Sequence, residues 1–158
     1  MIKLYSILIL SILTICSPIT INAQSVGYYG MDYSVIKEDT SFYIIVKSCS
    51  DDMRFVNEPT MKIRTFNDEV LTVKGVTIDS SSESYGLLFG ALMIPVTEIT
   101  SLAQFKLTQE QFELLNNGVS KIRLSMIPKN HERTFKKDKI GKKLYKYYLD
   151  VKMKEEDF

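Results

Sequence analysis

Apolar and polar residues alternate over much of the chain after residue 24, which is the pattern of half-buried β-strands. The alternation is clear in residues 61–66 and again in 70–78. Asn67 and Asp68, which lie between these two runs, are residues that favour turns. The pattern therefore predicts a β-hairpin over 61–78.

Further runs predict additional strands. Residues 42–46 are aromatic or β-branched, residues 26–36 form a weaker strand rich in tyrosine, and residues 121–126 alternate before Pro128. Residues 79–84 are polar and predict a loop. Residues 85–96 are almost wholly apolar, but they contain Gly86, Gly90 and Pro95, so they predict a central strand kinked at a glycine rather than a helix.

A short helix is predicted over 108–117. Thr108 and Gln111 have the spacing of a capping box, in which each side chain binds a backbone N–H at the helix start. Leu107 and Phe112 stand at the positions of a hydrophobic staple, and Gly118 is suited to the end of the helix.

A second helix is predicted over 138–152. Its apolar positions recur at helical spacing and form one face: Ile140, Leu144, Tyr148 and Val151. Asp138 is placed to cap the helix start, and Gly141 costs about 1 kcal/mol within the first turn.

These elements indicate an α+β fold that is mainly β. We expect an antiparallel sheet or sandwich with one inserted short helix (108–117) and a C-terminal helix (138–152), in a single globular domain over 24–158. Strands at hairpin spacing argue against a parallel α/β fold.

The first 23 residues have the pattern of a secretory signal peptide. Lys3 precedes an apolar segment, 4–15, and Ala23 is a small residue at the expected cleavage site. The apolar segment is too short to span a bilayer. The expected location is therefore periplasmic or extracellular. Lipid attachment at Cys16 is the alternative, and it would anchor the protein to a membrane.

Few residues offer catalytic chemistry. Beyond the leader, Cys49 is the only cysteine, so an internal disulfide is excluded. His131 is the only histidine and lies in a polar stretch, where we expect it to be exposed. A nucleophilic pair of Cys49 and His131 requires the fold to bring them together. The chain has no nucleophile-elbow motif and no glycine-rich phosphate loop.

Metal binding is equally weakly indicated. Asp79 and Glu83, with the serines between them, offer oxygen ligands for calcium, and Asp51 and Asp52 do the same in another polar stretch. Such stretches are usually solvated turns. We therefore assign no catalytic, cofactor-binding or metal-binding residue, and no cofactor.

Charge is distributed unevenly along the chain. Residues 24–120 carry 7 Lys and Arg against 13 Asp and Glu, whereas residues 121–158 carry 12 against 6. The two parts either attract each other across the fold or offer a basic surface to an anionic partner.

The basic residues cluster in the predicted C-terminal helix and just before it. They are Lys136, Lys137, Lys139, Lys142, Lys143 and Lys146, with Tyr145, Tyr147 and Tyr148 between or beside them. Docking of this helix on the core is the first interpretation, and contact with a partner or a membrane surface is the second. Nucleic acid is not expected as a partner. Tyrosines Tyr28, Tyr29, Tyr33 and Tyr43 would suit a sugar-binding face, although tyrosine is also common in strands.

Two stretches, "LTQEQFELLNNGVSKIRL" (107–124) and "TFKKDKIGKKLYKYYL" (134–149), resemble small exported proteins of Gram-negative gut bacteria. The resemblance covers about the last third of the chain after the leader. It implies an exported domain and transfers no active site.

We therefore expect an exported, non-enzymatic domain that binds a protein or glycan partner or supports an envelope assembly. The alternatives are a small hydrolase with a site that no motif reveals, and a secreted inhibitor or immunity-type protein.

Overall fold

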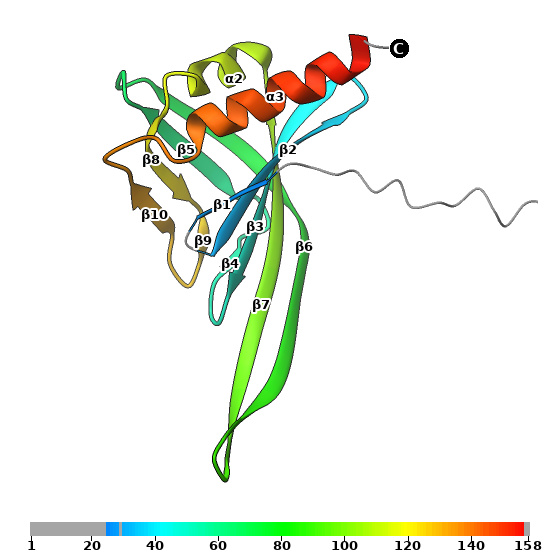
Figure 1. The fold of residues 1–158 in the computed structure, drawn as a ribbon, viewed down its shortest axis with the longest axis vertical. Helices are drawn as coiled ribbons and strands as arrows, with labels where there is room; N and C mark the ends of the chain where they lie inside the picture. Colours follow the sequence, from blue (N-terminus) through cyan, green and yellow to red (C-terminus); the bar gives the residue numbers. More distant parts are fainter. Residues whose placement is uncertain (1–24, 29, 157–158) are drawn as a thin grey trace, which may run out of the picture.

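The computed structural model describes residues 25–28 and 30–156, and its main feature is one curled antiparallel sheet (Figure 1). The strands of this sheet lie in the order β1-β2-β3-β7-β6-β5-β8-β10, and every neighbouring pair is antiparallel. A separate two-stranded ribbon pairs β4 with β9. The predicted mainly β, antiparallel fold is confirmed, as a half-barrel rather than a sandwich of two large sheets.

The strands have the following bounds in chain order: β1 (Ser25–Tyr28), β2 (Met31–Glu38), β3 (Ser41–Ser50), β4 (Arg54–Phe55), β5 (Thr60–Thr65), β6 (Val70–Phe89), β7 (Leu92–Leu107), β8 (Val119–Leu124), β9 (Met126–Ile127) and β10 (His131–Thr134). The predicted hairpin over 61–78 is confirmed as β5 and the first part of β6, which pair with Ile63 opposite Leu71. The predicted first strand, 26–36, is instead two strands that meet at Gly30, whose φ of 73° favours glycine.

Both predicted helices are confirmed. Helix α2 (Gln109–Leu115) begins with the complete capping box, in which the Thr108 hydroxyl accepts from Gln111 N–H and the Gln111 side chain accepts from Thr108 N–H. Helix α3 (Gly141–Glu156) begins three residues later than the cap residue Asp138. The Asp138 carboxylate accepts hydrogen bonds from the backbone N–H groups of Gly141, Lys142 and Val119, which join the helix start to β8.

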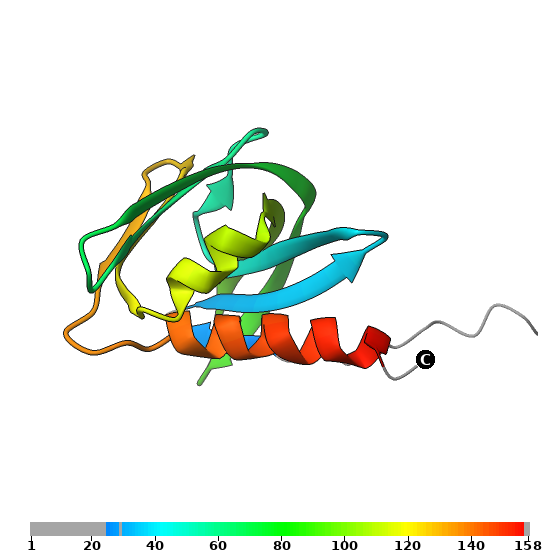
Figure 2. The same cartoon turned by 90° about the horizontal axis from the view of Figure 1, so that it is seen from above.

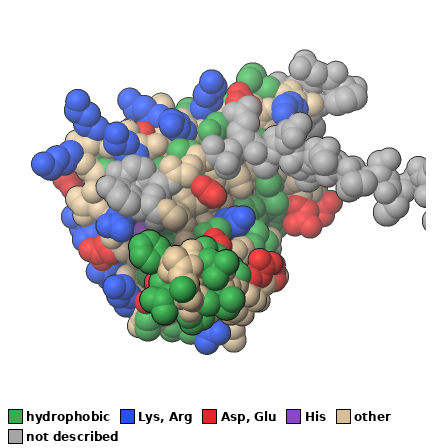
Figure 3. Space-filling view, turned by 60° about the horizontal axis from the view of Figure 1, so that its bottom comes forward, with side chains coloured by type: hydrophobic (Ala, Val, Ile, Leu, Met, Phe, Trp, Pro, Cys, Tyr) green, Lys and Arg blue, Asp and Glu red, His purple; other side chains and the backbone are tan. Residues whose placement is uncertain are grey.

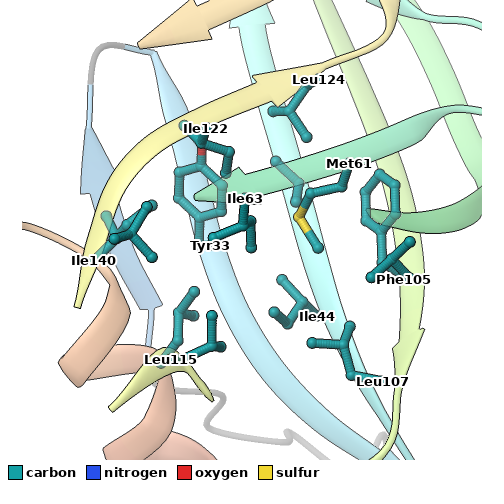
Figure 4. Packing of buried hydrophobic residues seen from close by; sticks show 14 of the residues in the cluster. Tyr33, Ile44, Met61, Ile63, Phe105, Leu107, Leu115, Ile122, Leu124 and Ile140 are labelled. Atoms are coloured by element: carbon teal, nitrogen blue, oxygen red, sulfur yellow. The ribbon is translucent and has the colours of Figure 1, made fainter. Parts of the chain in front are cut away.

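The core fills the concave side of the curled sheet. Seen from above, the strands form an open curve with α2 inside it and α3 along the open side (Figure 2). Alternate residues of the strands point into this space, where Tyr33, Ile44, Met61, Phe105 and Ile122 are almost wholly buried (Figure 4). The opposite, convex side of the sheet is called the outer face below.

The predicted apolar face of α3 is docked on the core. Leu144 and Tyr148 are buried, and the Tyr148 ring stacks on Phe112 of α2 with centroids 4.5 Å apart. Phe42 of β3 meets the same tyrosine edge-on at 4.9 Å. Three lysines in the first half of this helix, Lys142, Lys143 and Lys146, are exposed. The first interpretation of the basic helix, docking on the core, is therefore the observed one.

The largest correction concerns residues 79–96. The polar stretch 79–84 is part of strand β6 and not a loop. The apolar stretch 85–96 is not a central buried strand, because it turns back at Gly90 and Ala91 to form the end of a long β6–β7 hairpin. That hairpin extends far beyond the rest of the sheet and is exposed to solvent (Figure 1).

The predicted signal peptide, 1–23, and the possible lipid attachment site at Cys16 lie outside the described residues. Within the described ranges, no helix has both the length and the apolar character required to cross a bilayer.

Candidate functional site: the apolar hairpin arm

The hairpin arm, defined here as residues 83–98, is the part of β6 and β7 that continues past the neighbouring strands. Strand β3 pairs with β7 only as far as Ser50 opposite Ile99, and β5 pairs with β6 only from Lys74 towards Val70. Beyond these points each strand of the arm has one neighbour and one open edge. The arm is therefore a two-stranded ribbon projecting from the body.

The arm ends in a tight turn. Phe89 and Leu92 are opposite each other and are joined by the two residues Gly90 and Ala91. Gly90 has a φ of 63°, and glycine at the first position of a two-residue loop is typical of the turn whose twist matches paired strands. Counting back from this turn, Pro95 falls at a position without cross-strand hydrogen bonds, so proline is tolerated there.

The apolar tip, residues 85–96, is hydrophobic on both of its faces. Leu88 and Met93 are opposite each other on one face and are 74% and 70% exposed, while Phe89 and Leu92 on the other face are 77% and 68% exposed. No charged residue occurs between Glu83 and Glu98. Figure 3 shows the resulting patch of hydrophobic side chains at the end of the molecule. Exposed apolar patches of this kind usually mark sites of interaction.

The base of the arm carries two carboxylates on one face. Glu83 and Glu98 are directly opposite each other in the β6–β7 register, and both are exposed. Like charges at directly opposite positions destabilise a strand pair. The two glutamates line a shallow outer-face hollow of about 160 Å³ together with Lys47, Cys49, Ser81 and Thr100.

A second charged surface, the basic face, lies on the outer side of β5 and β8. Lys62 is directly opposite Arg123, and Arg64 is directly opposite Lys121. These four cations surround a shallow hollow of about 180 Å³ that also includes Val70. Glu132 of β10 contacts Lys121 at 2.6 Å and also pairs with Arg123. One carboxylate against four cations leaves the basic face with a charge of about +3.

Cys49 and His131 are not brought together. The Cys49 side chain lies on the outer face of β3, where its Sγ is 3.8 Å from Thr100 Oγ1. The sequence predicts that His131 is exposed, which is wrong: the residue is 5% exposed and points to the inner side of β10, opposite the buried Leu124. Burial, with a smaller contribution from Arg133, lowers the pKa of His131. The sheet separates the two side chains, so they cannot act as a nucleophile and its base.

The other candidate residues are also separated. Asp79 and Glu83 lie on one extended strand four residues apart, a spacing of about 13 Å, which is too far for one calcium ion. Across the ranges the structure describes, no three His, Cys, Asp or Glu side chains gather as a metal site. Asp51 and Asp52 are exposed in the β3–β4 connection.

The proposed tyrosine face does not form around Tyr33. That side chain is buried in the core, and burial raises its pKa. Tyr43 is only partly exposed. Tyr29 and the side chain of Tyr28 lie outside the described part of the chain.

Sequence reasoning missed the arm, although a signal was present. Residues at equal distances before Gly90 and after Ala91 are of similar type. The pairs include Phe89 with Leu92, Leu88 with Met93, and, farthest from the turn, Glu83 with Glu98. Ser84 and Thr97, which are hydroxyl residues at mirrored positions, bond each other at 3.0 Å. Such symmetry about a glycine indicates a hairpin.

Comparison with protein-family models, curated proteins and solved structures finds no match to this chain. Function is therefore argued from the arm and the surfaces near it.

Proposed function

We propose that this protein is an exported, non-enzymatic binding protein, and that the hairpin arm is its binding element. The observation that carries the proposal is the apolar tip, which presents large side chains to solvent on two faces. Burying one such side chain is favourable by about 1.5–3 kcal/mol, so a partner that covers the tip gains substantial free energy.

The shape of the arm supports insertion into a partner. The tip is the part of the molecule farthest from α3 and from the strands that surround the core (Figure 1). A partner can therefore enclose it without displacing the body. The tight turn and the continuous β6–β7 pairing hold the tip in an extended form before binding, which reduces the entropy lost on association.

The proposal can be tested in cells that produce the protein, by replacing one residue at a time with a photo-cross-linking amino acid. At Phe89 we expect adducts of higher mass after illumination. Glu38, which is also exposed but lies at the far end of β2, is the control and should give none. If position 89 gives no adduct in folded protein, the arm is not a binding element and the proposal fails.

A further inference from the structure

We infer that the partner of the arm is a second copy of this chain, and that the arm of one copy docks on the basic face of another. This inference rests on the proposed function, because it names what the arm binds. The observation that carries it is that the charges on the two surfaces are complementary, and exposed apolar side chains accompany the charges on both surfaces.

The arm contributes an acidic pair that is only partly balanced, because the two carboxylates share their hollow with one cation, Lys47. Glu83 and Glu98 face each other across the strands, and within the part of the chain that is described neither forms a salt bridge. Their mutual repulsion is relieved when a cation lies over both of them. A docking partner should therefore present a lysine or arginine beside the apolar tip.

The basic face carries an excess of positive charge. Its two cross-strand pairs, Lys62 with Arg123 and Arg64 with Lys121, each place like charges together. Glu132 forms salt bridges with Lys121 and Arg123 of β8. Among the described residues, no salt bridge is found to Lys62 or Arg64 of β5. Lys62 and Arg64 are exposed and available to the carboxylates of another copy.

Apolar side chains accompany the charges on both surfaces. On the arm, Tyr85 and Val96 form the row two residues beyond Glu83 and Glu98, a distance of about 7 Å. On the basic face, exposed Val70 is directly opposite Arg64 in the same row, and exposed Phe66 lies in the turn that follows β5. A carboxylate that meets Arg64 therefore brings the start of the apolar tip close to Val70.

A lipid bilayer suits the arm less well. Both outer edges of the arm carry unpaired backbone groups, and in hydrocarbon each unpaired group costs several kcal/mol. The glutamates at the base would also lie against the lipid headgroups. A protein surface can satisfy these groups, and the complementary one is present on the same chain.

The contact joins two different surfaces of the chain. A pair of copies can exchange arms and close as a dimer, or the contact can repeat from copy to copy as an open series. In both cases the same residues meet, so the same substitutions disrupt the assembly.

Sedimentation of the purified protein tests the inference. We expect a species of at least twice the monomer mass at concentrations up to about 100 µM, which covers the affinities of most standard interfaces. The species should decrease at 1 M salt, where charges are screened beyond about 3 Å. Glu83→Lys with Glu98→Lys should weaken association about tenfold or more, whereas the control pair Glu38→Lys with Asp52→Lys makes the same change in net charge and should have little effect.

A charge exchange gives the decisive measurement. Lys62→Glu with Arg64→Glu should weaken association on its own. Combining these two substitutions with Glu83→Lys and Glu98→Lys should restore it, because each surface then has the charge that the other had. If the four-residue variant remains as weak as its parents, the arm does not dock on the basic face.

The outcomes separate this inference from the proposed function. If the protein is monomeric at all concentrations tested but forms adducts with another protein at position 89, the partner is not a second copy. The arm then remains a binding element. If the protein is monomeric and floats with phosphatidylcholine vesicles, the arm binds a membrane and the inference is also wrong. If the protein is monomeric and position 89 gives no adduct, both proposals fail.

Discussion

His131 shows how a single side chain makes this fold sensitive to pH. It is buried on the inner side of β10, and burial lowers its pKa below the ordinary value of about 6.5. The neutral form is therefore the one that fits the folded protein. In the unfolded chain the same side chain takes up a proton as the pH falls through about 6.5.

The free energy of unfolding should consequently fall as the pH is lowered from 7.5 to 5.5. Because the unfolded state binds more protons than the folded state in this range, the contribution of His131 is present above about pH 6.5 and is lost below it. A single proton changes stability by at most about 1.4 kcal/mol per pH unit. Denaturant unfolding of the wild type and of His131→Leu at several pH values measures the effect.

The leucine variant should lose less stability than the wild type on acidification, because leucine matches the apolar surroundings and takes up no proton. Carboxylates elsewhere contribute equally to both proteins, so the difference isolates His131. Equal losses in the two proteins would show that His131 is not the source of the dependence.

Residue-level predictions from sequence succeeded where the interaction is local. Thr108, Gln111 and Asp138 were identified as capping residues, and all three form the expected hydrogen bonds. From the sequence alone, Gly141 is only a cost to the helix. In the fold, a Cβ at this position would lie 2.7 Å from Val119 N, so glycine allows the helix start to approach β8. That contact joins residues distant in sequence, so a local sequence pattern cannot predict it.

At the scale of elements, the hairpin arm is the part of the fold that carries no core contact of its own. Glu83 and Glu98 are directly opposite each other at the base of the arm, six residues from the Phe89–Leu92 pair that flanks the turn, so they form a hydrogen-bonded pair that a two-residue turn can join. The residues beyond them are exposed, apart from the partly exposed Val96.

Replacing residues 84–97 by Asn-Gly should therefore leave the body folded. We expect the free energy of unfolding to change by no more than about 1 kcal/mol, because no buried side chain is removed. Circular dichroism and thermal unfolding check this. An unfolded product would show that the arm is needed for the body to fold.

The arm also shows where reading elements from sequence reaches its limit. A run of apolar residues with a glycine inside it fits a buried strand and equally fits an apolar hairpin tip, because burial is a property of neighbours and not of the run itself. Strands β5 and β8 are easier to predict, because each has one face exposed to solvent and one face buried in the core. Neither the basic face nor the acidic pair was predicted, since both depend on which strands become neighbours and in which register.

At the scale of the whole molecule, hydrophobic exposure and charge occupy separate regions. The tip is uncharged, the base of the arm is acidic, and the outer side of β5 and β8 is basic. A nearly neutral protein with such segregated surfaces is suited to specific association and is also prone to non-specific association.

The tip should account for most of the binding of a hydrophobic dye by the folded protein. Leu88→Ser with Phe89→Ser should reduce the fluorescence of bound anilinonaphthalene sulfonate by about half or more, because these side chains are among the most exposed apolar groups of the described chain. The control is Ile127→Ser with Met153→Ser, which removes two exposed apolar side chains far from the tip.

Little change is expected in the control, and thermal unfolding of both variants confirms that they remain folded. Dye fluorescence that depends equally on the two pairs would show that the tip is not the main hydrophobic surface.

The central position of β6 and β7 in the sheet also has a mechanical consequence. The arm is a direct continuation of two strands that are held between β3 and β5 by backbone hydrogen bonds. A pulling force applied at the tip therefore runs along the strands and loads those hydrogen bonds together, in shear, instead of opening them one by one. A partner that held the tip could transmit tension to the body without peeling an edge strand from the sheet.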